Sequence, residues 1–505
     1  MSERAKHADP WAAIQEHELQ PLAGLFQADP DRLGRLSLDV AGIRFDWSKT
    51  HLDAALVEAF SALADAHGLA GARDELFAGA IVNLSEGRAA THVAERGQGD
   101  PGHVALAAAR HQRMRSLIDA IEGGAFGEVY GLLHIGIGGS ALGPELLLDA
   151  LGRNLGSYGV SILSNIDGQA VDDAVDPLDP ETTLIVAVSK TFATSETLLN
   201  LDSALRWLTE AGVEDPFGRV IAVTADPEAA LRFGIDETRI LPFDTGVGGR
   251  YSLWSAVGFS AALALGWEAF EELLEGAAAM DRHFRLADPA ANAPVLAAFA
   301  DQLYRRKLGC QSRAVFPYDE RLRLLVAYLQ QLEMESNGKS VSAAAGQPVG
   351  RPTAPVTWGG VGTDAQHAVF QLLHQGTDVI PVEFLGVVEQ EDSQDPAHHR
   401  ALLLNAFAQG AALMAGDRSE DAYRASPGDR PSATILLDRL DPRTLGALIA
   451  FYEHRTFTNA VLMGINPFDQ FGVELGKRLA RRLGEPESRE GLDASTRALI
   501  ERAGL

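Results

Sequence analysis

The sequence predicts an α/β protein made of two sandwich halves with mainly parallel sheets. Short apolar runs without polar alternation recur along the chain between helical stretches, which is typical of parallel strands covered on both faces. A first set of runs, before residue 281, lies at 131–137, 160–163, 184–188 and 219–223. A second set, after residue 281, lies at 313–316, 379–384 and 433–437. In open sheets of this kind, ligands are expected beyond the carboxyl ends of the strands.

A helical arm is expected before the first half and a helical tail after the second. The length of 505 residues corresponds to about three domains at roughly 150 residues each. The first hundred residues are mostly polar with helical spacing, and breaker residues at 97–102 end them. The predicted division is an arm at 1–100, a first half at 101–280, a second half at 281–480 and a tail at 481–505.

The composition, with 46% hydrophobic and 22% charged residues, is that of a soluble globular protein. The formal net charge of −26 argues against binding to nucleic acid or to an anionic membrane surface. Cys310 is the only cysteine, so an intrachain disulfide and a cysteine zinc cluster are excluded. The N-terminus is too polar for a signal peptide, and the apolar stretch at 253–267 is shorter than the roughly 20 residues of a membrane span. We therefore expect a cytoplasmic protein with a buried helix at 253–267.

A glycine-rich loop follows the first predicted strand. In Gly136-Ile-Gly-Gly-Ser140, glycines let a ligand approach the backbone, and the amide groups of the next helix attract anions. The segment also fits a minimal dinucleotide-binding pattern, Gly136-x-Gly138-x-x-Ala141, but the next acidic residue, Asp167, lies further along than that pattern requires. A tight turn between strand and helix is the alternative explanation.

A hydroxyl-rich loop follows the strand at 184–188. Ser189-Lys-Thr-Phe-Ala-Thr194 places three hydroxyls, one ammonium and a helix N-terminus within six residues, which suits a phosphate group. Thr191 or Thr194 could instead simply cap the helix. Lys190 favours the phosphate site, because a cap needs no cation.

Arg250 and, separately, a pair of glutamates further along the chain are candidates for chemistry. Arg250 follows two glycines before an apolar helix, where it could bind an oxyanion through two hydrogen bonds or lie on the surface. Glu333 and Glu335 lie at the end of a predicted helix, where a carboxylate could act as a general base. At about 100° per residue, Glu333 points nearer the apolar stripe of that helix. Helical phase therefore does not select Glu335.

Histidines and a lysine in the second half are further candidates. His374 is expected in the last turn of a helix at 363–375, where the helix dipole favours its protonated form. His367 lies on roughly the same face, so the two could pair or one could be structural. Lys477 could donate a proton or be a solvated cation. The adjacent His398 and His399 point apart on any regular element, so no metal is expected.

Taken together and in order, these motifs resemble the glucose-6-phosphate isomerase family. The resemblance spans roughly residues 45–480 and includes Ile-Gly-Ile-Gly-Gly-Ser at 135–140, Ser-Lys-Thr-Phe at 189–192, Val-Gly-Gly-Arg-Tyr-Ser-Leu-Trp-Ser at 247–255, Met-Glu-Ser-Asn-Gly-Lys at 334–339, Gln-His at 366–367, Leu-Leu-His-Gln-Gly-Thr at 372–377, Gly-Val-Glu-Leu-Gly-Lys at 472–477 and Asn-Leu-Ser-Glu-Gly-Arg at 83–88. It implies two sugar isomerase-type halves and an aldose–ketose isomerase of glycolysis and gluconeogenesis. That enzyme would interconvert D-glucose 6-phosphate and D-fructose 6-phosphate through a cis-enediol or enediolate.

The resemblance also implies a role for each matching residue. Glu335 would move a proton between C2 and C1, Arg250 would stabilise the enediolate, and His374 would open the sugar ring with help from Lys477. The residues expected to hold the phosphate or line the sugar site are Ser189, Lys190, Thr191, Thr194, Gly139, Ser140, Gln331 and Gln470. The site would lie at a homodimer interface and be completed by the partner subunit's His374. No metal or organic cofactor is implied.

Two other functions are weighed against this one. A sugar-phosphate sensor without catalysis would need the phosphate loop but not Glu335, His374 and Lys477. A nicotinamide-dependent oxidoreductase would use the Gly136-x-Gly138 loop. Conversion of fructose 6-phosphate into glucose 6-phosphate without any cofactor would distinguish the isomerase from both.

Overall fold

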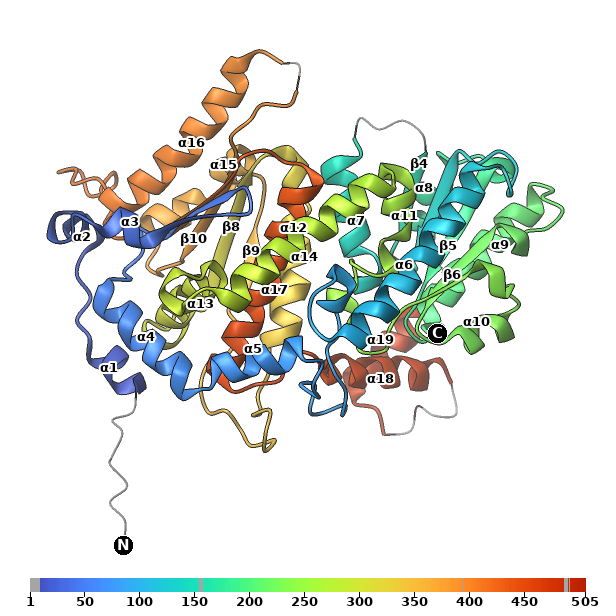
Figure 1. Cartoon of the computed structure of the whole chain (residues 1–505), viewed down its shortest axis with the longest axis horizontal. Coiled ribbons are helices and arrows are strands. Elements are labelled where there is room, and N and C mark those ends of the chain that lie inside the picture. The colour runs from blue at the N-terminus through green and yellow to red at the C-terminus, as the bar shows by residue number, and fades with distance from the viewer. Residues whose placement is uncertain (1–9, 154–157, 393, 486–488, 490) are drawn as a thin grey trace, which may run out of the picture. The chain divides into compact units, whose positions relative to one another are not determined.

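The computed structural model describes residues 10–153, 158–392, 394–485, 489 and 491–505 (Figure 1). The chain divides into two compact units, the first ending at Pro467 and the second beginning at Phe468. Both sheets belong to the first unit. Their mainly parallel strands, with helices between them, confirm the predicted fold class.

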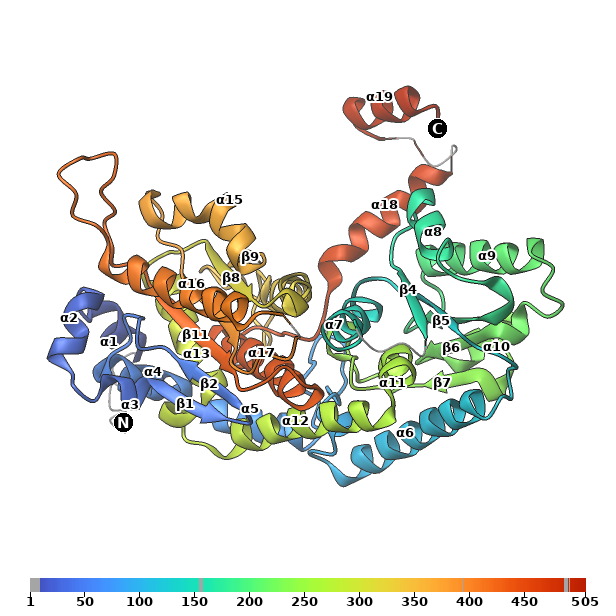
Figure 2. The same cartoon turned by 90° about the horizontal axis from the view of Figure 1, so that it is seen from above.

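The first sheet has five parallel strands in the order β4-β3-β5-β6-β7. All five residues of β3 and all six of β5 are buried, because helices cover both faces. In Figure 2, α8 and α9 lie on one side of this sheet and α6 on the other. The strands are β3 (Gly131–Ile135), β4 (Gly159–Leu163), β5 (Thr183–Val188), β6 (Val220–Thr224) and β7 (Ile240–Pro242), and the helices are α6 (Pro101–Glu122), α7 (Leu142–Leu151), α8 (Gly168–Val175), α9 (Ser195–Glu210), α10 (Pro227–Phe233) and α11 (Phe259–Leu265).

The second sheet has the order β1-β2-β11-β10-β8-β9, with β11, β10, β8 and β9 parallel. Helices α15 and α16 pack on one face of it (Figure 2). The long helix α17 is buried along nearly its whole length and packs against α12 and α13. The elements of this half are β8 (Ser312–Tyr318), β9 (Val356–Gly359), β10 (Val382–Val387), β11 (Ser432–Leu437), α12 (Trp267–Leu286), α13 (Ala293–Gln302), α14 (Leu325–Leu329), a π-helix (Gln330–Glu335), α15 (Gly362–Gln375), α16 (Pro396–Ala415) and α17 (Pro442–Met463).

The N-terminal arm is mainly helical, as predicted, but it also contains a β-hairpin that sequence analysis missed. Strands β1 (Ser37–Val40) and β2 (Ile43–Asp46) are joined by Ala41 and Gly42, both with positive φ, and β2 pairs antiparallel with β11. Each strand has only four residues, so its alternation is too short to outweigh the helical spacing around it. The arm's helices are α1 (Pro10–Glu16), α2 (Leu22–Ala28), α3 (Arg32–Leu36), α4 (Ala54–Ala66) and α5 (Leu69–Phe77).

Four other elements differ from prediction. Strand β10 was expected at 379–384 but begins after Pro381, which has no amide hydrogen to donate to the sheet. The buried helix expected at 253–267 is confirmed only as α11, because Gly266, with a φ of 91°, separates it from α12. Strands β7 and β9 were not predicted; β7 has three residues and β9 is a partly exposed edge strand.

The second unit contains α18 (Glu474–Gly484) and α19 (Ala494–Ala503). The division of the chain at residues 100, 280 and 480 stays a prediction. Among the helices of the described residues, none combines the length and apolar character needed to cross a membrane.

Candidate active site

The predicted phosphate loop lies between the carboxyl end of β5 and the first turn of α9. Phe192 has a φ of 46° and is 4% exposed, so its ring anchors the middle of the loop in the core of the first sheet. The Ser189 and Thr194 hydroxyls lie 3.1 Å apart. Thr194 occupies the cap position of α9, but within the described structure its side chain caps no amide. The amide groups of the first turn therefore remain available to a ligand, as an anion site requires.

Lys190 projects from this loop toward the segment before Arg250. Its Nζ donates hydrogen bonds to the carbonyl oxygens of Thr245, at 2.7 Å, and Val247, at 2.8 Å. These bonds use two of the three donors of the ammonium. Burial, followed by the nearby positive charge of Arg88, lowers the pKa of Lys190 to about 8. The lysine is therefore held in place and partly stripped of water beside the phosphate loop.

The glycine-rich loop packs directly against the segment that carries Arg250. A Cβ on Gly139 would lie 2.3 Å from the carbonyl carbon of Gly249, so only glycine permits this contact. A Cβ on Gly138, which has a φ of 57°, would lie 3.0 Å from Nε2 of Gln331. The close contacts of these glycines within the protein explain why glycine occurs there, so a dinucleotide-binding role is not needed to explain the loop.

Arg250 and Glu335 meet at this junction. Nη1 of Arg250 lies 3.3 Å from Oε2 of Glu335, while the arginine side chain is 1% exposed and the glutamate side chain 23%. Arg250 also donates from Nε to Oγ of Ser336 at 2.6 Å and from Nη2 to the carbonyl oxygen of Pro467. A buried, fixed guanidinium thus holds a carboxylate that solvent or a substrate can still reach.

Three residues around this pair were not singled out from the sequence for a role. Oγ of Ser336 lies 2.9 Å from the phenol oxygen of Tyr251, and burial raises the pKa of that phenol. Arg88 donates to the same Thr245 carbonyl as Lys190. Each lies within a motif noted in the sequence, yet only the folded chain brings Tyr251 and Ser336 together.

The two glutamates have different surroundings. Glu333, which helical phase placed nearer the apolar stripe, is 8% exposed, and its carboxylate pairs with Arg313. Glu335 points the other way, toward Arg250. The residue that phase favoured for burial is thus buried, and the residue named by family resemblance lies at the candidate site.

His374, Gln470 and Lys477 were also predicted for the site. His374 is in the last turn of α15, where its Nε2 lies 2.9 Å from Oε1 of Gln409 and its ring contacts Phe370. Gln470 and Lys477 belong to the second unit, where Lys477 is exposed in the first turns of α18. Within the first unit, the contacts given above connect Gly139 and Lys190 to the segment 245–250, Gly138 to Gln331, and Arg250 to Glu335.

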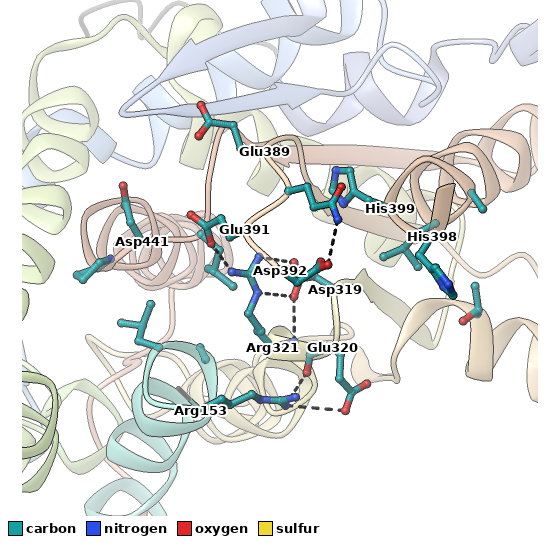
Figure 3. A pocket seen from close by; sticks show the side chains of 18 of the residues that line it. Arg153, Asp319, Glu320, Arg321, Glu389, Glu391, Asp392, His398, His399 and Asp441 are labelled. Atoms are coloured by element: carbon teal, nitrogen blue, oxygen red, sulfur yellow. Dashed lines mark hydrogen bonds and ion pairs between the residues drawn. The ribbon is translucent and has the colours of Figure 1, made fainter. Parts of the chain in front are cut away.

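A separate hollow of about 810 Å³ lies beyond the carboxyl ends of β8, β10 and β11 (Figure 3). Carboxylates surround Arg321 and Arg153 there, and the ion pairs of Arg321 with Asp319 and Glu391 are drawn in the figure. His398 and His399 also line it, but the residues that the structure describes hold no group of three potential metal ligands. The hollow includes none of the candidate residues among its described lining.

Comparison with known proteins identifies the family. The family model described as phosphoglucose isomerase matches residues 46–500. The chain belongs to this family. It is 65% identical over 493 residues to the glucose-6-phosphate isomerase of Rhizorhabdus wittichii, with 98% of each chain covered. It is 63% identical over 497 residues to that of Sphingopyxis alaskensis, covering 98% of this chain and 99% of the relative.

Solved structures agree with this family. The crystal structure of a glucose-6-phosphate isomerase from Chlamydia trachomatis matches with a TM-score of 0.88 at 32% identity, covering 96% of this chain and 97% of that one. A hypothetical protein, TT0462, from Thermus thermophilus matches with a TM-score of 0.67 at 25% identity, covering 87% and 99%. The predicted family, the aldose–ketose isomerase class and the interconversion of glucose 6-phosphate and fructose 6-phosphate are thereby confirmed.

Proposed function

We propose that this chain interconverts D-glucose 6-phosphate and D-fructose 6-phosphate at the junction of the phosphate loop, Arg250 and Glu335. The observation that carries the proposal is the contact between the partly exposed Glu335 carboxylate and the buried Arg250 guanidinium. In this arrangement a base and a fixed cation face the same space, which is what removal of a proton next to a carbonyl requires.

The phosphate group of the substrate is held by the loop after β5. We assign its ligands as Ser189, Lys190, Thr191 and Thr194, supported by the hydroxyl pair and by the ammonium beside it. Gly139, Ser140 and Gln331 face the sugar, supported by the tight packing of Gly138 and Gly139 at the same junction. Gln470 is assigned to the lining on the family resemblance alone. Binding energy from the phosphate then orients carbons C1 and C2 against the base.

Proton transfer follows in two steps. In open-chain glucose 6-phosphate, the Glu335 carboxylate removes the proton from C2, the C1–C2 double bond forms, and the carbonyl electron pair moves onto O1. Arg250 stabilises the negative charge that develops on the enediolate oxygen. Glu335 then returns the proton to C1, the C2 hydroxyl loses its proton to O1, and the C2 carbonyl of fructose 6-phosphate forms.

Opening of the sugar ring uses groups from outside the first unit of a single chain. We assign it to the partner subunit's His374 in a homodimer, with Lys477 assisting. Within its own chain, His374 contacts Gln409 and Phe370, whereas Glu335 contacts Arg250. These different partners support a site completed by a second copy. We also place the enzyme in the cytoplasm, in keeping with its single buried thiol at Cys310.

The proposal is tested with the purified full-length chain, fructose 6-phosphate and no added cofactor. Glucose 6-phosphate should appear, and Glu335→Gln should abolish most of this turnover while Glu320→Gln, an exposed glutamate away from the junction, should not. Binding of fructose 6-phosphate without turnover would overturn the proposal in favour of a sensor. Turnover that requires added nicotinamide would overturn it in favour of an oxidoreductase.

A further inference from the structure

Two carboxylates project from opposite sides of the π-helix Gln330–Glu335, and each pairs with an arginine. In a π-helix, whose hydrogen bonds run from residue i to residue i+5, each residue turns by roughly 85°, so Glu333 and Glu335, two residues apart, point in nearly opposite directions. Glu335 faces Arg250, and Glu333 faces Arg313. The mechanism proposed above uses Glu335 and leaves Glu333 without a role.

Glu333 is tied to the second sheet by strong, buried interactions. Nη2 of Arg313, on β8, donates to Oε1 of Glu333 at 2.6 Å and also to its other oxygen. The hydroxyl of Thr357, on the edge strand β9, donates to Oε2 at 2.6 Å. The side chains of Glu333 and Arg313 are 10% and 5% exposed, and Thr357 is fully buried. Both oxygens of the carboxylate are therefore held by neighbouring strands.

Arg313 is also fixed by a second carboxylate. Its Nη1 donates to Glu383, on β10, at 3.2 Å. Glu383 also accepts from Arg455, on α17, at 2.7 Å. The anchor that Glu333 contacts is thus part of a charged network that joins β8, β10 and α17, and it has little freedom to move with the π-helix.

We propose that Glu333 is a positioning residue for Glu335: its attachment to Arg313 and Thr357 fixes the rotation of the π-helix and so aims Glu335 at the reacting carbons. This inference rests on the proposed function, in which Glu335 is the base. A π-helix departs from the regular helical hydrogen-bond pattern and is common at functional sites. A displacement of about 1 Å at a reacting group can cost on the order of a hundredfold in rate, so a tether on the opposite side of one turn has a direct catalytic effect.

The test compares two variants that release the π-helix with one that removes a buried hydroxyl elsewhere. Thr357→Val removes one hydrogen bond to Glu333, leaves the charge of Glu333 in place and nearly keeps the volume of residue 357. Glu333→Gln removes the ion pair with Arg313. Thr183→Val is the matched control for Thr357→Val, because it also removes a fully buried hydroxyl, at the amino end of β5 and outside the charged network. Each variant is assayed for kcat, KM, Tm and the deuterium isotope effect with glucose 6-phosphate labelled at C2.

We expect Thr357→Val and Glu333→Gln to lower kcat by at least about tenfold, because Glu335 is no longer held in the orientation that proton transfer needs. KM should stay within about twofold, because the phosphate site is intact. The isotope effect should rise, since removal of the C2 proton becomes slower than the other steps. Partial unfolding would lower the concentration of active enzyme without changing that isotope effect. Thr183→Val should lower Tm but leave kcat within about twofold and the isotope effect unchanged.

Wild-type kcat and isotope effect in Thr357→Val and Glu333→Gln would overturn this inference, as would equal losses of kcat in Thr183→Val. If Glu333→Gln does not fold, Thr357→Val decides alone. Full turnover by Glu335→Gln would instead overturn the assignment of the base in the proposed function. The two failures are therefore distinguishable.

Discussion

Arg250 contacts Glu335 from the protein interior, with Nη1 and Oε2 separated by 3.3 Å, and leaves the opposite side of the carboxylate open. The guanidinium is held in place by Ser336 and by the carbonyl oxygen of Pro467, so it needs little rearrangement when charge develops on a substrate oxygen. Residues 85 positions apart in the chain are in this way combined into one reactive unit.

Replacing Glu335 by Gln should lower kcat at least about a hundredfold with little change in KM, as expected for the loss of a general base. The amide keeps the size of the side chain but cannot accept the C2 proton. Steady-state kinetics with fructose 6-phosphate measures both constants. Near-normal turnover in Glu335→Gln would remove Glu335 from the role of base.

The affinity for substrate should weaken as pH rises above about 8. The pKa of Lys190 is lowered to about 8, chiefly by burial, so the free enzyme carries an ammonium at pH 7 and mostly a neutral amine at pH 9. A phosphate dianion needs the ammonium, and KM should therefore rise between these two pH values. Lys190→Ala should have a strongly raised KM at pH 7 and should lose this pH dependence. An unchanged KM in Lys190→Ala would exclude Lys190 from the phosphate site.

Ser336→Ala, which removes the hydroxyl, should lower kcat by more than its loss of stability can explain. Ser336 is fully buried, accepts from Arg250 and bonds the Tyr251 phenol, so Ser336→Ala removes one hydrogen bond from each of two buried polar groups, at a cost of about 0.5–1.5 kcal/mol each. We expect kcat to fall about tenfold, because Arg250 loses one of its supports.

The control is Thr183→Val, which removes an equally buried hydroxyl from the amino end of β5, opposite the phosphate loop. It should lower Tm without changing kcat. Equal kinetic effects in Ser336→Ala and Thr183→Val would contradict a specific role for Ser336.

A mixture of two inactive variants should regain activity if the site is shared between subunits. Neither Glu335→Gln nor His374→Ala alone should turn over efficiently. After unfolding and refolding together, half of the dimers are hybrids with one intact site of two, so about a quarter of wild-type activity should return. Specific activity and the mass of the assembly measure this. If a verified hybrid shows no activity, either His374 and Glu335 of the same chain form one site, or one of the two residues does not take part in catalysis.

The strands of both sheets were predictable where burial on two faces makes them continuously apolar. The run at 184–188 became β5 with a difference of one residue, and 433–437 became β11 with the same small difference. The hairpin at 37–46 was not predictable, because its strands are short and β2 pairs with β11, which lies far away in the sequence. Strand β9 was not predictable, because it is short and partly exposed.

The phosphate loop was predictable from chemistry alone, since its donors lie within six consecutive residues. The pairing of Arg250 with Glu335 was not, because it depends on how the two halves fold together. Helical phase distinguished Glu333 from Glu335 by burial, but only family resemblance indicated which of them carries the chemistry. Tyr251 has no local signal that separates it from an ordinary core aromatic residue.

The pairing of β2 with β11 also has a consequence for synthesis of the chain. The hairpin leaves the ribosome about 390 residues before the strand that covers its inner edge, a delay of roughly 20–80 s at 5–20 residues per second. During that interval the nascent arm presents an open strand edge, of the kind that pairs with other chains. The N-terminal hairpin therefore stays exposed to such pairing until β11 has been synthesised.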